Sequence, residues 1–294
     1  MNPETPPDGR FILHPSSFIL PRGRSLTIDR PPAVMGIINA TPDSFSDGGA
    51  FVDPAKAIEA ALQMEADGAA VIDIGGESTR PGSEPIAAQT EIDRVLPVIA
   101  GIRERTDIAI SIDTRKAAVA DEAIRAGADI VNDVSALRYS AGIAAILART
   151  GVPVILMHMR GEPATMQQYA HYDDVVAEVG RELTQFRDDA VRAGIDRAQI
   201  LVDPGIGFAK TSEHNLEILA RAAELTNIAP LVIGASRKKF IGALTGREPH
   251  ERAAGSLAAV AAAHRTGAAL VRVHDVRATV DFLNVLRAIA EREQ

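Results

Sequence analysis

The sequence contains no cysteine among its 294 residues. This absence excludes disulfide bonds, thiolate nucleophiles and cysteine-ligated zinc or iron–sulfur sites. Tryptophan is also absent, and aromatic residues make up only 4% of the chain, so aliphatic residues and alanine must fill the core. Because a protein without cysteine suits a reducing compartment, we expect a cytoplasmic location.

A basic excess is lacking too, since the formal net charge is −8. Surfaces that bind nucleic acid or anionic membranes need an excess of Lys and Arg, so we expect neither kind of partner. A local basic pocket for a small anion is still compatible with this charge. No apolar stretch approaches the roughly 20 residues of a membrane span. Glu4 and Asp8 precede any apolar run, which is untypical of a signal peptide.

One unit recurs after residue 30: a helical segment ends in glycine, an apolar run follows, and a polar residue stands where the run stops. The glycines fit the position just after a helix, where a left-handed backbone is needed. They are Gly68, Gly127, Gly151, Gly194 and Gly267.

Eight such runs predict eight strands, near residues 34–38, 70–74, 108–112, 129–132, 154–157, 200–202, 231–234 and 269–273. Helical patterns lie between them and after the last, at residues 54–67, 89–105, 116–126, 143–150, 173–193, 212–225, 251–266 and 276–293. Continuous apolar strands that alternate with helices indicate a parallel sheet. Eight units in this length predict a single-domain (β/α)8 TIM barrel over residues 31–294, preceded by an N-terminal extension over residues 1–30 that is partly disordered or a hairpin. An open doubly wound sheet is the alternative, but Gly75-Gly76 lacks the G-x-G-x-x-G spacing.

Polar side chains end every predicted strand, and in a barrel these ends form the active-site rim. They are Asn39, Asp73 with Glu77–Arg80, Asp113, Asn132 with Asp133, His158, Asp203, Ser236–Lys238, and Arg272 with His274. Single members could be helix caps, as we expect for Asp53, Thr114 and Ser212. For Asp133 or Asp275 taken alone, a helix cap is as good an interpretation as a functional role. It does not explain the whole ring.

The ring divides into two chemical sectors. Asp113, Asn132 and Asp203, with Lys238 beside them, offer acceptors that suit a planar heterocycle with a donor-rich edge. The other sector offers donors and cations for phosphate oxygens, with or without a metal: Asn39, Thr79, Arg80, Arg272 and His274. No G-x-S-x-G elbow, P-loop or H-E-x-x-H motif occurs. The chemistry therefore needs no protein nucleophile if one substrate brings the leaving group and the other the nucleophile.

Blocks at these strand ends resemble the dihydropteroate synthase family, in order from residue 34 to residue 276. They read MGIINATPDSFSDGG, DIGGESTRPG, SIDTRK, NDVS, LMHMRG, LVDPGIGFAK, GASRKKF and RVHDV. The resemblance implies a folate-biosynthesis transferase on a TIM barrel. Such an enzyme joins 6-hydroxymethyl-7,8-dihydropterin diphosphate to 4-aminobenzoate, with Mg²⁺ as the cofactor, and is usually a homodimer.

The resemblance also implies residue roles. Asp113, Lys238 and Arg80 are the expected catalytic residues. The pterin diphosphate would contact Thr79, Asp113, Asn132, Asp203, Lys238, Arg272 and His274. Asn39 would bind Mg²⁺ and diphosphate. The 4-aminobenzoate pocket would comprise Phe45, Arg80, Pro81, Phe208 and Lys238.

Two positions vary from the family pattern. Lys239 replaces the common serine after the S-R-K lysine, and it could pair with the aminobenzoate carboxylate or point to solvent. Ile206 stands where some members have Phe, which would make that wall of the site smaller.

Two other functions compete. A pterin-binding methyltransferase that passes a methyl group from methyltetrahydrofolate to a corrinoid protein would share Asp113, Asn132 and Asp203, but it should not need the T-P-D-S-F-S-D-G-G and S-T-R-P-G loops. A catalytically silent barrel acting as a partner subunit should have lost part of the ring, and no member is lost.

Overall fold

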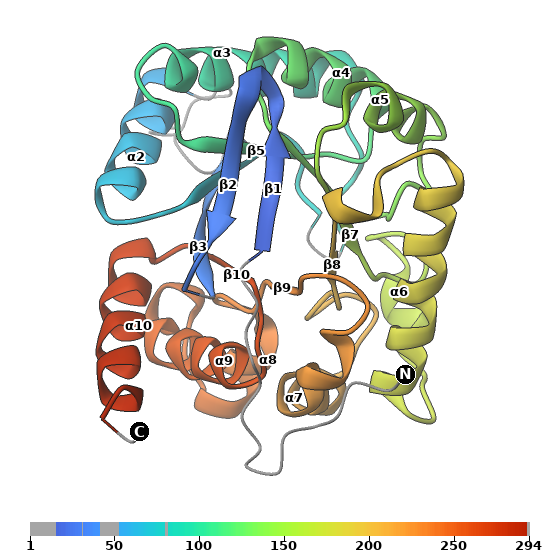
Figure 1. Ribbon diagram of the computed structural model, residues 1–294. Helices are drawn as coiled ribbons and strands as arrows, with labels where there is room; N and C mark the ends of the chain where they lie inside the picture. Colours follow the sequence, from blue (N-terminus) through green and yellow to red (C-terminus); the bar gives the residue numbers. More distant parts are fainter. Residues whose placement is uncertain (1–15, 31, 42–52, 80–81, 293–294) are drawn as a thin grey trace.

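The computed structural model describes residues 16–30, 32–41, 53–79 and 82–292. Eight parallel strands form one sheet in the order β8-β7-β6-β5-β4-β3-β10-β9 (Figure 1). A parallel bridge between Val202 of β8 and Leu231, just before β9, joins the two ends of that order. The sheet therefore closes into the predicted TIM barrel, and the open-sheet alternative is wrong. The strands are β3 (Ala33–Asn39), β4 (Val71–Gly75), β5 (Ala109–Asp113), β6 (Ile130–Asp133), β7 (Val154–Met157), β8 (Ile200–Asp203), β9 (Val232–Ile233) and β10 (Leu270–Val273).

Helices surround this barrel and bury their apolar faces against it (Figure 1). They are α2 (Pro54–Ala66), α3 (Ala88–Arg103), α4 (Ala117–Ala126), α5 (Gly142–Thr150), α6 (Val175–Arg192), α7 (Ser212–Arg221), α8 (Lys239–Thr245), α9 (Ala253–Arg265) and α10 (Val276–Ala290). Short 3-10 turns complete the connections: η1 (Pro21–Gly23), η2 (Met166–Tyr169), η3 (Arg197–Gln199), η4 (Ala222–Leu225) and η5 (Pro249–Glu251).

The five glycines predicted to end helices all have positive φ, from 67° at Gly151 to 125° at Gly127. A side chain would strain the backbone in this conformation, so glycine ends each helix cheaply. Since each end fixes where the next strand begins, these glycines also set where the polar strand ends fall on the rim.

Two of the three expected helix caps differ from the structure. Asp53 caps α2 by accepting a hydrogen bond from the Ala55 N–H. Thr211, not Ser212, caps α7, because its Oγ1 accepts from the His214 N–H in a capping box. Thr114 lies three residues before the start of α4, where its Oγ1 accepts from the Lys116 N–H. The chain also forms α8, a helix that the sequence pattern did not predict.

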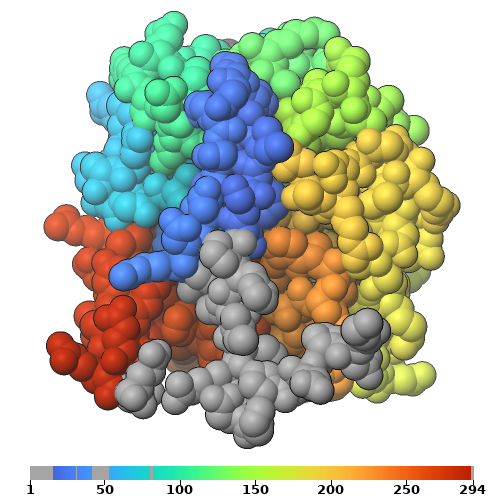
Figure 2. Space-filling model, in the orientation of Figure 1, coloured from blue at the N-terminus to red at the C-terminus, as the bar shows by residue number. Residues whose placement is uncertain are grey.

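The N-terminal end of the barrel is covered by a hairpin of β1 (Ser16–Leu20) and β2 (Arg24–Ile28). Alternate hairpin side chains, among them Phe18 and Ile28 at 2% exposure, pack against the first residues of the barrel strands. Figure 2 shows the hairpin, in blue, lying across the middle of this face. The opposite end, where the strands carry their polar residues, is therefore the end available to substrates.

A buried carboxylate anchors this hairpin. Asp129, which is fully buried, accepts from Arg22 at 2.6 Å, from Arg24, and from Arg103 of α3 at 2.6 Å. Its second oxygen also accepts from the Ile110 N–H at 3.0 Å. Three cations around one buried charge compensate for its lost hydration.

Among the helices of the residues that the structure describes, none combines the length and the apolar character that a membrane span requires.

Candidate active site

The carboxyl ends of the strands bring the predicted ring together. Asn39, Asp113 and Asp203 are the last residues of β3, β5 and β8, whereas Asn132 lies next to last in β6 and Arg272 in β10. Register fixes their spacing, because Asp113 pairs with Asn132 on one side and with Gly75 on the other. His274 follows β10 directly. The barrel thus places residues up to 235 positions apart in the chain (39 to 274) on one rim.

The centre of the ring is an ion-pair cluster. Arg272 donates from Nε to Asp73 Oδ2 at 2.6 Å and from Nη2 to Asp113 Oδ2 at 2.8 Å. Asn132 donates from Nδ2 to the same Asp73 oxygen at 3.2 Å. One guanidinium therefore serves two carboxylates, and the cluster keeps one excess negative charge when both carboxylates are ionised. The division into two sectors was wrong for Arg272, which lies among the acceptors.

Asp203 lies in the same cluster and is held by its own loop. Its Oδ1 accepts from the Gly205 N–H at 2.7 Å. Gly205 has φ +69°, and a Cβ there would lie 2.0 Å from the His158 carbonyl oxygen, so only glycine fits. Gly234 borders the other side, where an added Cβ would lie 3.6 Å from Asp203 Oδ2 and 3.8 Å from Arg272 Cβ. Gly234 therefore leaves a space beside the carboxylate that a Cβ would fill.

The electrostatics of the cluster favour a ligand that donates hydrogen bonds. Burial raises the pKa of Asp113 to about 7, with Arg272 opposing the rise and Asp73 adding to it. Burial also raises the pKa of Asp203, against the lowering effect of the Gly205 N–H. Burial would lower the pKa of Arg272, but Asp73 and Asp113 raise it above its ordinary value. Donors that approach these carboxylates would replace lost hydration and favour their ionised forms.

His274 is held as a neutral hydrogen-bond donor. Its pKa is lowered to about 4 by burial and by the nearby Arg272 charge. Ser236 Oγ accepts from the His274 N–H at 3.2 Å and lies 3.1 Å from its Nδ1. When the Ser236 hydroxyl donates to Nδ1, the ring proton is on Nε2. An Nε2–H group on the rim can donate to a phosphate oxygen.

Lys238 reaches the ring from the turn after β9. Arg237, at φ +56°, begins the bend and pairs with Asp275, its Nε lying 3.1 Å from Oδ2. Arg252 then donates to the Arg237 carbonyl at 3.1 Å. Lys238 Nζ lies 4.3 Å from the centre of the Phe208 ring, a cation–π contact. Phe208 and Lys238, both predicted for the aminobenzoate pocket, are therefore neighbours.

The loop after β4 is fixed at its base by buried charges. Glu77 accepts from Lys116 Nζ at 2.9 Å, from Arg115 Nε at 3.3 Å and from the Ile86 N–H at 2.9 Å. Lys116 also donates to the fully buried Glu91 at 2.6 Å. These contacts explain why the S-I-D-T-R-K block continues past Asp113: its two cations hold the neighbouring loop.

Some predicted residues have no described geometry. Phe45, Arg80 and Pro81 lie outside the residues that the structure describes. Thr79 is described and half-buried in the loop after β4. Of the two variable positions, Ile206 is 1% exposed and packs in the core, and Lys239 is exposed at the start of α8.

The donor set suits Mg²⁺ only in part. Asn39 is half-buried at the end of β3, next to Gly75, where its amide oxygen is a hard ligand of the type that Mg²⁺ prefers. In the described part of the chain no group of three or more His, Asp or Glu residues is arranged around a metal. One protein oxygen fits a Mg²⁺ that keeps waters and is held mainly by substrate phosphates.

Asp73 is the site residue that sequence reasoning placed on the rim but did not assign to the substrates. Its position in a β4 run of fully buried residues was the available signal, since a carboxylate there needs a partner.

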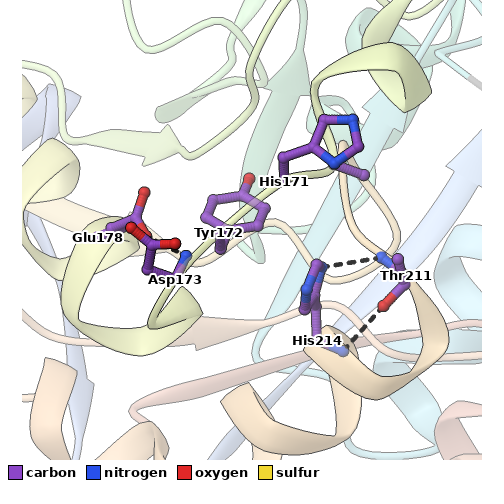
Figure 3. A pocket seen from close by; sticks show the side chains of 7 residues that line it. His171, Tyr172, Asp173, Glu178, Thr211 and His214 are labelled. Carbon is purple, nitrogen blue, oxygen red and sulfur yellow. Dashed lines mark hydrogen bonds between the residues drawn. The ribbon is translucent and has the colours of Figure 1, made fainter.

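An open cavity of about 410 Å³ lies apart from the ring (Figure 3), and it is lined by Ala170, His171, Tyr172, Asp173, Glu178, Thr211 and His214.

Comparison with known proteins agrees with this geometry. The family model described as "Pterin binding enzyme" matches residues 35–274. Dihydropteroate synthase of Escherichia coli (strain K12) is 45% identical over 268 residues, covering 91% of this chain and 94% of that protein. The Bacillus subtilis (strain 168) enzyme is 40% identical, covering 91% and 92%.

Solved structures give the same result. Xanthomonas albilineans dihydropteroate synthase with 4-aminobenzoic acid superposes with a TM-score of 0.88 at 46% identity, covering 94% of this chain and 99% of that one. The same enzyme in complex with 7,8-dihydropteroate gives 0.83 at 46% identity, covering 91% and 97%. By family model, relatives and fold, this chain belongs to the pterin-binding enzymes and, among them, to the dihydropteroate synthase family.

Proposed function

We propose that this chain condenses 6-hydroxymethyl-7,8-dihydropterin diphosphate with 4-aminobenzoate to give 7,8-dihydropteroate and diphosphate. The observation that carries this proposal is the set of acceptors at the strand ends, Asp113, Asn132 and Asp203, beside the guanidinium of Arg272. Asn132 and Asp203 are buried, and Asp113 shares that guanidinium with Asp73. A pterin ring presents several N–H donors along one edge, which is the complement that these carboxylates need. A ligand without those donors would leave buried carboxylates unpaired.

The reaction breaks the bond between the pterin methylene carbon and the diphosphate oxygen, and the bonding pair leaves with diphosphate. The amine nitrogen of 4-aminobenzoate forms the new bond to that carbon and then releases one proton. Positive charge develops on the pterin as the bond breaks. Asp113 and Asp203 stabilise it by accepting from ring N–H groups in a site that excludes most water.

The departing diphosphate is bound beside Arg272 and His274, at the edge of the acceptor cluster. Arg272 supplies charge and His274 supplies its neutral Nε2–H group, so the two residues donate to phosphate oxygens without a proton transfer. When bound, Mg²⁺ would neutralise charge on the leaving group, with Asn39 as its protein ligand. Lys238, Phe208, Phe45, Arg80 and Pro81 would surround 4-aminobenzoate, and Thr79 would contact the pterin substrate.

Product formation tests this function. Purified protein with both substrates and Mg²⁺ should release 7,8-dihydropteroate and diphosphate in equal amounts, and removing Mg²⁺ with a chelator should lower the rate. A parallel reaction with methyltetrahydrofolate and a corrinoid acceptor tests the competing function. If the protein forms no dihydropteroate but transfers the methyl group to the corrinoid, the methyltransferase function replaces the proposed one.

We further infer a cytoplasmic location, a division of the chain at residue 30 and a homodimer. A cytoplasmic location rests on composition, and the boundary between an extension over residues 1–30 and a barrel over residues 31–294 rests on the sequence pattern. A homodimer through helices late in the barrel is supported by exposed apolar side chains there, Leu244 on α8 at 63% and Val285 on α10 at 61%. Light scattering after size exclusion would measure a mass near twice 31.1 kDa if the dimer forms.

A further inference from the structure

A line of buried polar contacts lies behind the turn that follows β8. Lys210 is only 4% exposed, and its Nζ donates to the Phe208 carbonyl at 2.9 Å and lies 3.0 Å from His158 Nδ1. His158 is fully buried, and its Nε2 lies 3.0 Å from Glu182 Oε2 on α6. A buried ammonium is costly unless its donors are satisfied. Both of these partners are therefore part of what keeps Lys210 in the interior.

The protonation states of His158 and Lys210 determine which group donates in each of these hydrogen bonds. Burial, with Lys210 adding to it, lowers the pKa of His158 to about 4, so the ring is neutral at pH 7. Because Lys210 donates to Nδ1, the ring proton is on Nε2 and is donated to Glu182. Burial lowers the pKa of Lys210 to about 7, yet its nitrogen carries hydrogens in both protonation states. Lys210 therefore donates to the Phe208 carbonyl in either state.

The next carbonyl of the same turn is held from the other side. Tyr172, labelled in Figure 3, donates from its hydroxyl to the Ala209 carbonyl at 3.0 Å. Arg160 covers the Tyr172 ring at 4.1 Å and donates from Nε to Glu182 at 3.0 Å. Ala209 has φ +49°, a left-handed conformation that strains the backbone of an alanine. Two side chains thus hold a turn that its own backbone disfavours.

This turn sets the wall of the proposed aminobenzoate pocket. The Phe208 side chain extends from the residue whose carbonyl Lys210 holds, and Lys238 lies over its ring. We propose that Lys210 is a positioning residue for 4-aminobenzoate: with His158 and Glu182 behind it, it fixes Phe208 and thereby the Lys238 ammonium. This inference rests on the proposed function and adds a residue that touches neither substrate.

Steady-state kinetics and binary binding together test the proposal. Lys210→Met keeps the length of the side chain but removes its donors. We expect the KM for 4-aminobenzoate to rise about tenfold. The Kd for 6-hydroxymethylpterin, measured by calorimetry, should rise by less than threefold, because Asp203 and Asn132 are intact and only the contact with Lys238 is disturbed. Arg192→Met, which removes a cation at 69% side-chain exposure on α6, is the matched control and should change neither value.

A second pair of variants keeps the test decisive if Lys210→Met does not fold. His158→Asn retains an acceptor near the Nδ1 position, whereas His158→Leu does not, so the asparagine variant should keep a lower KM than the leucine variant. A KM rise at least threefold larger than any rise in pterin Kd supports the proposal, and any smaller difference overturns it. Failure of the proposed function would be visible separately, as wild-type protein that forms no dihydropteroate.

Discussion

Replacing Asp203 by Asn tests the acceptor role most sharply, because the change separates binding from folding. Asp203 is 6% exposed and uses Oδ1 to accept from the Gly205 N–H. An asparagine amide oxygen can accept that same bond, so the turn after β8 should persist. The substitution also removes a carboxylate whose pKa burial has raised, and with it a cost of desolvation. We therefore expect a melting temperature equal to or above that of the wild type.

Pterin affinity should fall in the same variant. The Asp203 Oδ2 atom, beside the space at Gly234, becomes either an NH₂ group facing ring donors or a neutral acceptor. Hydrogen bonds to charged groups contribute about 1.5–3 kcal/mol and neutral ones about 0.5–1.5 kcal/mol. The expected loss is about 1–3 kcal/mol, which is roughly a 5- to 150-fold rise in Kd.

Calorimetric titration with 6-hydroxymethylpterin measures this loss, and thermal unfolding of the same sample measures stability. Asp196→Asn is the matched control, since Asp196 accepts from the Ala198 N–H at an exposed turn before β8. Unchanged pterin affinity in Asp203→Asn would refute the assigned role. A large drop in melting temperature together with weak binding would show that the carboxylate holds the fold rather than the ligand.

Three further predictions follow from the same geometry. Burial raises the pKa of Asp113 to about 7, so lowering the pH from 8 to 6 should protonate this carboxylate and weaken pterin binding. Below the pKa, the Kd should rise about tenfold for each pH unit. In calorimetry, Asp113→Asn should bind the pterin weakly at every pH, without this dependence. Arg272→Ala removes the cation that Asp73 and Asp113 share, so denaturant unfolding should show a loss of about 3–5 kcal/mol at pH 8 and less at pH 6. Affinity for the diphosphorylated pterin should fall more than affinity for hydroxymethylpterin, and equal losses would restrict the role of Arg272 to contact with the pterin. Phe18→Ala should lower the free energy of unfolding by about 3–5 kcal/mol, because Phe18 is buried beneath the hairpin. The control Ile19→Ala, at a residue that is 73% exposed, should change it by less than about 0.5 kcal/mol. Similar values for both variants would mean that the hairpin does not contribute to stability.

The barrel could be predicted from the sequence because its signals are local. Each strand is a short buried run, and each preceding glycine adopts the positive φ that ends a helix. The helix α8 was missed because Lys239–Thr245 is only seven residues long and contains Gly242. At Gly242 an added Cβ would lie 2.2 Å from Arg252, so packing rather than helix propensity decides that residue.

The site could be predicted as a set of positions but not as a set of bonds. Asp113, Asn132 and Asp203 follow from the rule that parallel strands end on one rim. That Arg272 bridges Asp73 and Asp113 depends on side chains 199 and 159 residues away, which no local pattern specifies. The same is true of Lys210, whose partner His158 is 52 residues distant and whose burial has no sequence signal.

A structure of the chain in complex with 7,8-dihydropteroate tests the central claim most directly. We expect the pterin ring between Asp113, Asn132 and Asp203, with its N–H groups directed at the two carboxylates and its aminobenzoate end against Phe208 and Lys238. A product molecule bound elsewhere, such as in the cavity beside Tyr172 and His214, or a pterin ring that leaves Asp203 without contact, would contradict the account.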